Sequence, residues 1–478
     1  MTASHGWRFD HSYARLPPVL FEHARPAAFP GPAIVVLNHA LARELGLDFS
    51  AAGDGELAAI FTGQAIPEGA EPIAQAYAGH QYGHFAMLGD GRALLVGEQI
   101  APDGRRHDIQ FKGSGETPFS RRGDGRAALG PMLREYILSE AMHALGIPTT
   151  RSLAVATTGE SIARDGRKRG AVLTRVASSH IRVGTFQYAA AVEDPGALRA
   201  LADHAIDRHD PQLSGSPDKY AGFLRAVIAR QAELVARWQC VGFVHGVLNT
   251  DNTLVSGETV DYGPCAFMEA YNPNTVFSSI DHHGRYRYGH QPAIIQWNLS
   301  RFAEAMLALL SDDEPTAIAT ANEALEAFAV RFRACWLDGM RAKLGLASAE
   351  ADDLALLQEL FAAMQAGALD FTQAFRALSE DSGPEALAGW IPRWHARLAR
   401  ESRTPSEAQR SMRSVNPAVI PRNHRVEAAL AAAEAGDLGP FHELLRVLST
   451  PFELRPGSSG YAEPAPPEFE GYRTFCGT

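Results

Sequence analysis

The chain has 478 residues, 46% of them hydrophobic and 21% charged, which gives room for one large domain or for two to three ordinary ones. This balance excludes a disordered or collagen-like chain. With 44 basic and 55 acidic residues the net charge is −11, which argues against a general nucleic-acid or anionic-membrane surface. No apolar stretch approaches the ~20 residues of a membrane helix, and the first residues have no apolar signal core, so we expect a soluble cytoplasmic protein.

The numbers and positions of the cysteines and lysines exclude some kinds of site and mark one residue as a candidate. The four cysteines include no CxxC pair, which excludes a disulfide framework and a zinc site recognisable from the sequence. The lysines are only Lys112, Lys168, Lys219 and Lys343, so 40 of the 44 basic residues are arginines. A lysine placed at the end of a strand is therefore notable in this chain.

After the first 86 residues, which show no clear periodicity, the pattern indicates mostly strands up to about residue 186. Two alternating segments, 92–100 and 107–112, flank a Pro-Asp-Gly turn and predict a hairpin. A helix is predicted next, with Pro131 in its first turn and Gly146 at its end. A second hairpin is predicted to turn at Asp165-Gly166.

From about residue 197 the pattern is helical, in amphipathic and Ala-rich segments that reach about residue 448. The last 28 residues hold five prolines and four glycines and predict an extended tail. We therefore expect an α+β fold in three parts: an N-terminal segment with a strand-rich lobe (1–186), a larger helical lobe (187–450) and the tail (451–478). A cleft between two such lobes is where ligands bind.

The segment GFVHGVLNTDNTLVSGETVDYGP (242–264) carries the strongest chemical signal. A helix is expected to end near Gly242, and a polar loop then places Asp251 beside Asn252. Two very short strands, TLV and TVDY, are predicted to form a hairpin that brings Asn252 and Asp261 to the same end of the turn. Such oxygen ligands suit a hard cation like Mg²⁺ that is also bound to phosphates. The alternative is that these residues are ordinary turn formers.

This segment resembles the catalytic loop and the metal-binding Asp-Phe-Gly segment of protein kinases. One departure is clear. In kinases the catalytic base lies five residues before the metal-binding asparagine, and that position here is Val247. Asp251, immediately before Asn252, is the available substitute for the missing base.

Lys112 ends a predicted strand in the segment DIQFKGSG, where a kinase-like fold keeps its phosphate-binding lysine. Glu135 follows in the predicted helix, on a half-apolar face where an unpaired carboxylate is costly. A Lys112–Glu135 ion pair would remove that cost and fix the lysine toward phosphates. The alternatives are a surface lysine and an exposed helical glutamate.

Glycines and arginines gather in the same part of the chain. Two GDGR tetrapeptides occur, Gly89–Arg92 and Gly123–Arg126, and the first is placed to bind phosphates through backbone N–H groups, although each alone is a weak turn signal. Arginines clustered around a Gly-rich cleft favour a polyphosphate ligand. They are Arg92, Arg121, Arg122, Arg126, Arg175 and Arg182. A second basic group is expected to be solvated surface around a hairpin turn: Arg164, Arg167, Lys168 and Arg169.

Two histidine-rich segments are weaker candidates. HQYGH (80–84) mimics the histidine pair of zinc proteases, but a glutamine replaces the glutamate base and Gly83 interrupts the helix, so metal binding is not expected. His282, His283 and His290 lie in a segment rich in tyrosine and arginine that is a candidate substrate-facing loop without an assignable role.

Together these passages resemble the SelO family (selenoprotein O-like, also called YdiU), pseudokinases that act as protein adenylyltransferases. The resemblance covers most of the chain and is carried by long motifs: GDGRALLVGEQ, DIQFKGSGETPFSRRGDGRAALGPMLREYILSEAM, VLTRVASSHIRVGTFQ, HGVLNTDNTLVSGETVDYGP and NPAVIPRNHRVE. It implies a protein-kinase-like two-lobed fold that binds ATP in a flipped orientation. AMP would pass to Ser, Thr or Tyr of target proteins with Mg²⁺ or Mn²⁺, and metal-dependent UMP transfer is also known in the family.

The resemblance also implies roles for single residues. Asp251 would be the general base, and Asn252 and Asp261 would be metal ligands. Some relatives carry selenocysteine in the tail, where this chain has Cys476, and a regulatory disulfide from Cys476 to Cys265 is a further hypothesis. The nucleotide contacts would be Gly89, Gly91, Arg92, Lys112 supported by Glu135, Asp124, Gly125, Arg175, Arg182 and Asp261.

Two other functions stay open at this point. One is a phosphotransferase with an unusual base, acting on a protein or a small molecule. The other is a non-catalytic nucleotide-binding scaffold, which the Val247 departure suggests and the retained Lys, Glu, Asn and Asp residues argue against. The expected partners are protein substrates and a nucleoside triphosphate, with no nucleic acid and no membrane.

Overall fold

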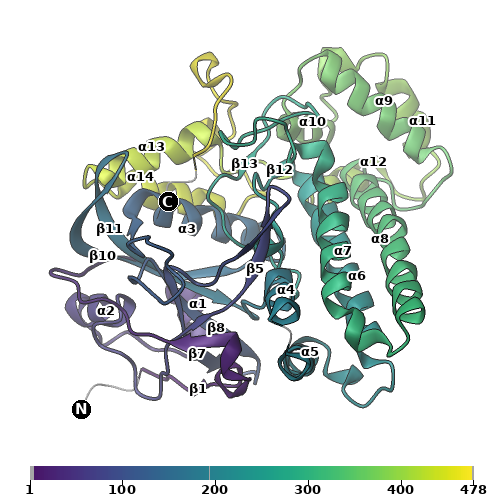
Figure 1. The fold of residues 1–478 in the computed structure, drawn as a ribbon. Coiled ribbons are helices and arrows are strands. Elements are labelled where there is room, and N and C mark those ends of the chain that lie inside the picture. Colours follow the sequence, from purple (N-terminus) through teal and green to yellow (C-terminus); the bar gives the residue numbers. More distant parts are fainter. Residues whose placement is uncertain (1–4, 193, 476–478) are drawn as a thin grey trace.

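Residues 5–192 and 194–475 are described in the computed structural model of the chain. They combine helices with one large antiparallel sheet of nine strands (Figure 1). Seven strands follow the order β2-β4-β7-β8-β11-β10-β3, while β1 pairs with β7 and β9 with β11. The strands are β1 (Phe9–Asp10), β2 (Phe21–His23), β3 (Ala33–Leu37), β4 (Ile73–Gln75), β7 (Ala93–Ile100), β8 (Arg106–Lys112), β9 (Ala127–Ala128), β10 (Arg151–Arg164) and β11 (Gly166–Ala177).

The two hairpins predicted from the sequence form the centre of this sheet. β7 pairs with β8 so that Ala93 lies opposite Lys112, and β10 pairs with β11 around a turn at Asp165. Successive apolar side chains of β11 enter different buried clusters, Val172 on one face and Leu173 on the other. The alternation that predicted the strands therefore also explains why both faces of the sheet are covered.

One face is covered by α3 (Leu129–Ala144), the helix predicted from its start and stop signals. Pro131 lies in its first turn, and Gly146 follows its end with φ +74°. Two helices from much later in the chain, α13 (Asn423–Glu434) and α14 (Gly439–Leu448), pack on α3 and share its buried cluster (Figure 1).

The opposite face is covered by α1 (His39–Glu44) and α2 (Asp54–Phe61), from the part of the chain without a predicted pattern. Phe61 of α2 and Phe111 of β8 belong to the same buried cluster. A separate antiparallel hairpin stands apart from the large sheet. Its strands are β5 (Ala78–Gln81) and β6 (His84–Met87).

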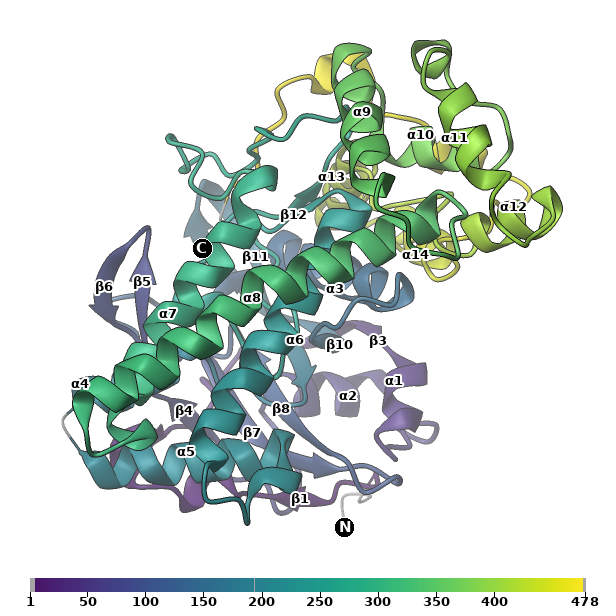
Figure 2. The ribbon, with the colours of Figure 1, turned by 90° about the vertical axis from the view of Figure 1, so that its right-hand side faces the viewer.

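The helices between α3 and α13 form a second part, seen side-on in Figure 2. Phe186, Phe223 and Phe302 meet at its centre, with ring centroids 4.9 to 6.0 Å apart. These helices are α4 (Val183–Ala191), α5 (Pro195–His209), α6 (Lys219–Val241), α7 (Gln291–Leu310), α8 (Glu314–Lys343), α9 (Asp353–Ala366), α10 (Phe371–Leu378), α11 (Ile391–Leu398) and α12 (Pro405–Arg413).

The short hairpin predicted from TLV and TVDY does not form, and that prediction was wrong. Leu254 pairs with Arg182, and Thr259 pairs with Thr149, so the two segments take their backbone partners from elsewhere. Three or four residues of alternating pattern do not determine which backbone will accept their hydrogen bonds. The strands that pair in this region are β12 (Phe243–Val244) and β13 (Ala266–Phe267).

The predicted tail contains only short 3-10 turns between residues 451 and 475. Hydrogen bonds hold it near the middle and near the end of that range. Arg422 donates to Ala462 O at 3.1 Å, and Thr474 Oγ1 donates to Pro264 O at 2.6 Å. Within the described residues, no helix has the length and apolar character needed to cross a membrane.

Candidate active site

A cavity of about 880 Å³ lies where the large sheet meets the loop that follows α6. Its walls come from the turn before β7, from β8, α3 and β11, and from residues 247–264. Arg122 alone of the predicted arginine cluster is not in its lining. All twelve predicted site residues line it: Gly89, Gly91, Arg92, Lys112, Asp124, Gly125, Glu135, Arg175, Arg182, Asp251, Asn252 and Asp261.

Lys112 is buried at the end of β8 and has two carboxylate partners. Its Nζ lies 2.7 Å from Glu135 Oε2 on α3, which confirms the predicted ion pair. The same Nζ lies 2.7 Å from Asp261 Oδ1 in the loop after α6. The lysine therefore connects the sheet and its covering helix to the loop that carries the predicted metal ligands.

Two arginines complete this ion cluster. Arg175 Nε and Nη2 lie 2.8 and 2.5 Å from Glu135 Oε1, and its Nη2 lies 2.6 Å from Asp261 Oδ1. Arg182 Nη1 lies 3.0 Å from Asp261 Oδ2 and also donates to the Asp251 carbonyl. With Lys112, three cations pair with two carboxylates, and ammonium and guanidinium groups of this kind can also bind an anionic ligand.

The cations fix the charge of both carboxylates. Burial alone would raise the pKa of Asp261, but the surrounding cations, Arg175 foremost, hold it well below its usual value. The pKa of Glu135 is lowered in the same way, since Arg175 and Lys112 outweigh its burial. Both side chains are thus ionised at neutral pH. Asp261 also has φ +63°, a left-handed conformation that aspartate and asparagine tolerate better than most residues.

Asp251 lies in a 3-10 turn, Thr250–Asn252, and is only 7% exposed. Its Oδ1 has no hydrogen-bond partner among the described residues, and its Oδ2 is 3.5 Å from Gln81 Nε2. Burial raises the pKa of Asp251 to about 6, although the positive charge of Arg182 opposes this. A buried carboxylate with one unpartnered oxygen is suited to accept a proton or a ligand atom.

The β5–β6 hairpin holds the turn that carries Asp251. His80 N donates to Thr250 Oγ1 at 2.7 Å. Gly79 is packed so closely that a Cβ at this position would lie 2.2 Å from Asp251 Oδ1. No role is predicted for this hairpin from the sequence, yet its backbone sets the position of the predicted base.

Asparagines shape the rest of the loop. Asn249 Oδ1 accepts from Tyr82 N at 3.1 Å and from Tyr286 Oη at 2.6 Å. Asn252 Nδ2 donates to Val247 O at 3.0 Å, which leaves its Oδ1 without a partner in the described part of the chain. The residue at the kinase base position, Val247, therefore supports the orientation of Asn252 through its carbonyl group.

The first GDGR tetrapeptide forms a tight turn against a neighbouring segment. Gly89 has φ +130°, and a Cβ there would lie 2.4 Å from the Phe119 ring. Ser120 Oγ donates to Gly91 O at 2.5 Å. Close packing of residues 119–120 is thus one reason for glycine at these positions, and it is independent of phosphate binding.

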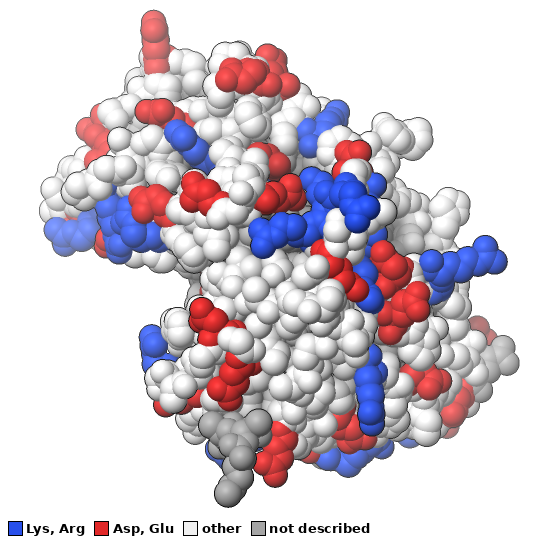
Figure 3. Space-filling view, turned by 90° about the vertical axis from the view of Figure 1, so that its left-hand side faces the viewer, with Lys and Arg blue, Asp and Glu red and all other residues white. Residues whose placement is uncertain are grey.

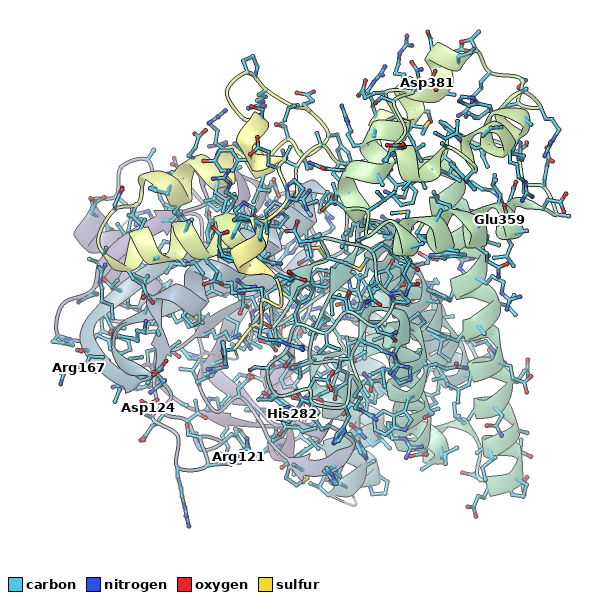
Figure 4. The ribbon with its side chains drawn as sticks, turned by 90° about the horizontal axis from the view of Figure 1, so that it is seen from above. Arg121, Asp124, Arg167, His282, Glu359 and Asp381 are labelled. Atoms are coloured by element: carbon cyan, nitrogen blue, oxygen red, sulfur yellow. The ribbon has the colours of Figure 1, made fainter. Side chains whose placement is uncertain are left out.

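Two members of the basic group predicted to be solvated surface, Arg164 and Lys168, also line the cavity and are partly exposed there. Arg164 Nη1 and Nη2 lie 2.8 and 2.7 Å from the Asp124 carboxylate, and Lys168 Nζ lies 3.0 Å from Glu434 on α13. Arg167 is exposed, as predicted, and lies at the outer edge in Figure 4. Figure 3 shows basic and acidic side chains interspersed on this side of the molecule.

Comparison with known proteins decides the family. A family model described as "Protein adenylyltransferase SelO" matches residues 6–449. A "Protein nucleotidyltransferase YdiU" from Geobacillus kaustophilus is 57% identical over 481 residues, and one from Anoxybacillus flavithermus is 56% identical over 476 residues, with 99% of each chain covered in both cases. One from Nitrosococcus oceani is 54% identical over 481 residues, with 99% of this chain and 98% of that one covered. The chain belongs to the SelO family.

Sequence reasoning missed two residues of this SelO-family site. Asp90 is buried in the turn before β7, where its Oδ2 accepts from Gln75 N at 3.2 Å and from Gln110 Nε2 at 3.3 Å. Burial raises its pKa to about 6. The Tyr77 ring centroid lies 4.8 Å from the Arg182 guanidinium carbon. Asp90 lies within a GDGR tetrapeptide and was open to prediction, whereas no local pattern marks Tyr77.

The weaker candidates fall outside the ion cluster. HQYGH forms the β5–β6 hairpin, in which Gln81 lies opposite His84. In the described part of the chain, no group of three or more His, Cys, Asp or Glu residues is arranged to hold a metal ion.

Cys265 is buried and its Sγ donates to Tyr262 O at 3.3 Å. Cys476 lies outside the described residues, so the disulfide between them stays a hypothesis.

Proposed function

We propose that this chain transfers AMP from ATP to the hydroxyl groups of serine, threonine or tyrosine residues in other proteins. The description of its family and the names of its relatives support this activity. The observation that carries the proposal is that one cavity is lined by a buried cluster of three cations and by Asp251, whose Oδ1 has no hydrogen-bond partner among the described residues. In such a cavity the cations can bind a triphosphate, and the Asp251 carboxylate can accept a proton beside it.

A kinase-like arrangement follows from the same proposal. The large sheet and α3 would form the nucleotide-binding lobe (1–186), and the helices from α4 onward the second lobe (187–450), before the tail (451–478). The Lys112–Glu135 pair joins a strand to a helix, as the phosphate-orienting pair of kinases does. On this view α13 and α14, although late in the chain, reinforce the first lobe because they pack on α3.

The nucleotide phosphates would bind the cations of the cavity. Lys112, Arg175 and Arg182 already point at carboxylates and can turn their N–H groups to phosphate oxygens with little movement. Arg92 and Arg121 line the same cavity and have no carboxylate partner among the described residues. We assign further contacts to the turn residues predicted from the sequence, Gly89, Gly91, Asp124 and Gly125.

The side-chain oxygen atoms that line the cavity are suitable ligands for a divalent cation, Mg²⁺ or Mn²⁺. Asn252 Oδ1 and the Asp261 carboxylate are hard ligands of the kind that these ions prefer, and both residues line the cavity. When bound, such an ion neutralises phosphate charge. We therefore assign Asn252 and Asp261 as its protein ligands.

Asp251 is the proposed general base. The acceptor hydroxyl oxygen would attack the α-phosphorus of ATP, the bond from that phosphorus to the oxygen bridging to the β-phosphate would break, and pyrophosphate would leave. The hydroxyl proton would pass to the Asp251 carboxylate, whose burial keeps it from being solvated by bulk water. Lys112, Arg175 and Arg182 would stabilise charge on the leaving pyrophosphate.

The position of the radioactive label tests this function. Incubation with α-³²P-ATP and a divalent cation should label an acceptor protein or the enzyme itself, whereas γ-³²P-ATP should not. Intact-mass measurement should show added AMP and no added phosphate. Transfer of only the γ-label would indicate a phosphotransferase instead, and ATP-dependent thermal stabilisation without any transfer would indicate a nucleotide-binding scaffold.

A further inference from the structure

Large exposed hydrophobic side chains gather at one side of the cavity. Of the eight in the described part of the chain, four lie there: Phe85 (48% exposed), Met87 (44%), Ile280 (53%) and Phe475 (73%). Phe475 itself lines the cavity. We call the β5–β6 hairpin, the loop 276–287 and Phe475 the rim. Exposed apolar side chains concentrated beside a catalytic cavity indicate an interaction surface.

The parts of the rim are in contact with one another. The Tyr82 and Tyr286 rings, from the hairpin and the loop, have centroids 5.1 Å apart. Ser279 N donates to Thr474 O at 2.9 Å, which places Ile280 beside the segment that carries Phe475. Figure 2 shows the hairpin projecting from the edge of the molecule. The rim is therefore one surface formed by three segments.

The rim borders the proposed base directly. Gly79 and His80 of the hairpin contact the turn that carries Asp251. The His80 ring touches Phe85 and Trp297, with centroids 5.3 Å apart in both pairs. A protein segment that lies across the rim would thus pass beside the Asp251 carboxylate, as an acceptor of AMP must.

The rim has more positive than negative charge on a chain whose net charge is −11: three arginines stand against Asp281, which is buried and accepts from the backbone N–H groups of Arg285 and Tyr286. Arg285 lies between Trp297 and Tyr286, with its guanidinium carbon 4.8 and 5.7 Å from their ring centroids. Arg287 and Arg473 donate to backbone carbonyl groups at 3.0 and 2.8 Å. None of the three has a carboxylate partner among the described residues.

We propose that the rim is the docking surface for acceptor proteins and that it selects segments with acidic residues next to the hydroxyl-bearing residue. The apolar side chains would hold the segment, and Arg285 with Arg287 would pair with its carboxylates. The outer edge of β6 pairs with no other described strand, which leaves room for an extended segment. The exposed His282 and His283, singled out in the sequence, lie in the same loop. This inference rests on the proposed adenylyltransferase function.

Two synthetic acceptors test the charge preference. Random copolymers of Glu and Tyr and of Lys and Tyr, matched in length and tyrosine content, are incubated with the full-length chain, α-³²P-ATP and Mg²⁺ or Mn²⁺. We expect the Glu–Tyr polymer to be labelled about tenfold faster at low salt, with the difference shrinking at high salt. Attraction by the net charge of the chain would give the opposite order, because the chain is acidic.

Variants of the rim locate the effect. Arg285→Gln should raise KM for the Glu–Tyr polymer about fivefold, with kcat changed less than about twofold. The reason is that a charge on the docking surface affects mainly the association of enzyme and acceptor and has little effect on the chemical step. Arg333→Gln is the matched control, because Arg333 is an exposed arginine on α8 that forms no ion pair with any other described residue. Should Arg285→Gln fail to fold, Arg287→Gln and the exposed Phe85→Ser serve in its place.

The outcomes separate the docking surface from the chemistry. Equal labelling of both polymers, faster labelling of the Lys–Tyr polymer, or rim variants with an unchanged KM would overturn the docking proposal. The same holds if neither polymer is labelled by enzyme that still adds AMP to itself in an intact-mass measurement. Absence of AMP on every acceptor and on the enzyme would instead overturn the proposed function, and the docking proposal with it.

Discussion

Lys112 Nζ lies 2.7 Å from Asp261 Oδ1, although 149 positions of the chain separate the two residues. The contact joins the last residue of β8 to a loop residue whose backbone has φ +63°. Both Asp261 oxygens are bound by cations, since Oδ2 also pairs with Arg182. Ligand binding in the cavity must therefore exchange partners within this cluster, and changes to Asp261 should affect metal and phosphate differently.

Asp261→Asn should abolish metal-dependent transfer while the chain still binds ATP in the absence of metal. The variant removes one negative charge and leaves Lys112 and Arg175 facing Glu135 alone, so the cavity becomes more positive. Transfer measured with α-³²P-ATP, and ATP-induced shifts in Tm with and without Mg²⁺, would show this. Transfer that stays metal-dependent at the parental rate would contradict the assignment of Asp261 as a ligand.

Asparagine is the substitution of choice at this position. Its side chain tolerates the left-handed conformation of Asp261, whereas alanine would add backbone strain of about 1 kcal/mol or more. Asp261→Ala should therefore lower Tm more than Asp261→Asn. The difference in Tm between the two variants therefore reports the cost of the left-handed backbone conformation, because both variants lose the same charge.

Asp251→Asn should lower transfer about 100-fold or more, the scale of losing a general base. Asparagine keeps the shape that fits against Gly79, so ATP affinity should change by less than about threefold. Single-turnover transfer and calorimetric ATP binding are the two measurements. A variant that retains more than about a third of the parental rate would show that another group takes the proton.

Gly79→Ala should impair transfer nearly as much as Asp251→Asn, without touching any ionisable group. The new Cβ would lie 2.2 Å from Asp251 Oδ1, so either the carboxylate or the β5–β6 hairpin must move. Gly55→Ala is the matched control, because a Cβ at that helical position meets no atom within 4 Å. Parental activity in Gly79→Ala would mean that the position of Asp251 is not critical.

The ion cluster was predictable because its members have strong local signals. Lys112 ends a clear strand in a chain with few lysines, and Glu135 lies on a half-apolar helical face that an unpaired carboxylate would not favour. These two observations predicted a contact that the structure contains. The local sequence pattern was sufficient to predict this contact, because Lys112 lies in a strand and Glu135 in a helix whose hydrophobic periodicity is clear.

Contacts between distant segments were not predictable in this way. Leu254 was predicted to pair within its own hairpin but pairs with Arg182, because short segments take whichever backbone partner the fold presents. The partner of Lys168, Glu434, comes from α13, 266 positions later in the chain, and no local pattern indicates that contact. Gly79 gave no signal at all, since its importance depends on a carboxylate 172 positions later in the chain.

Asp90→Asn should stabilise the folded chain at high pH and have no such effect at low pH. Burial raises the pKa of Asp90 from 3.8 to about 6, so the folded chain holds this proton over a range in which the unfolded chain has released it. The contribution of Asp90 to the free energy of unfolding is therefore complete below pH ~4, where its carboxyl group is protonated, and it is lost as the pH rises to ~6. Asparagine cannot titrate, and its Oδ1 can still accept from Gln75 and Gln110.

The free energy of unfolding from denaturant titrations at pH 4 and pH 8 measures the effect. The variant should gain up to about 3 kcal/mol relative to the parent between these two pH values, because one pKa unit corresponds to about 1.4 kcal/mol. Asp312→Asn controls for the loss of one negative charge at an exposed position. A difference between Asp90→Asn and the parent that is the same at both pH values would show that Asp90 is ionised at no cost in the folded chain, and that the cavity already compensates its charge.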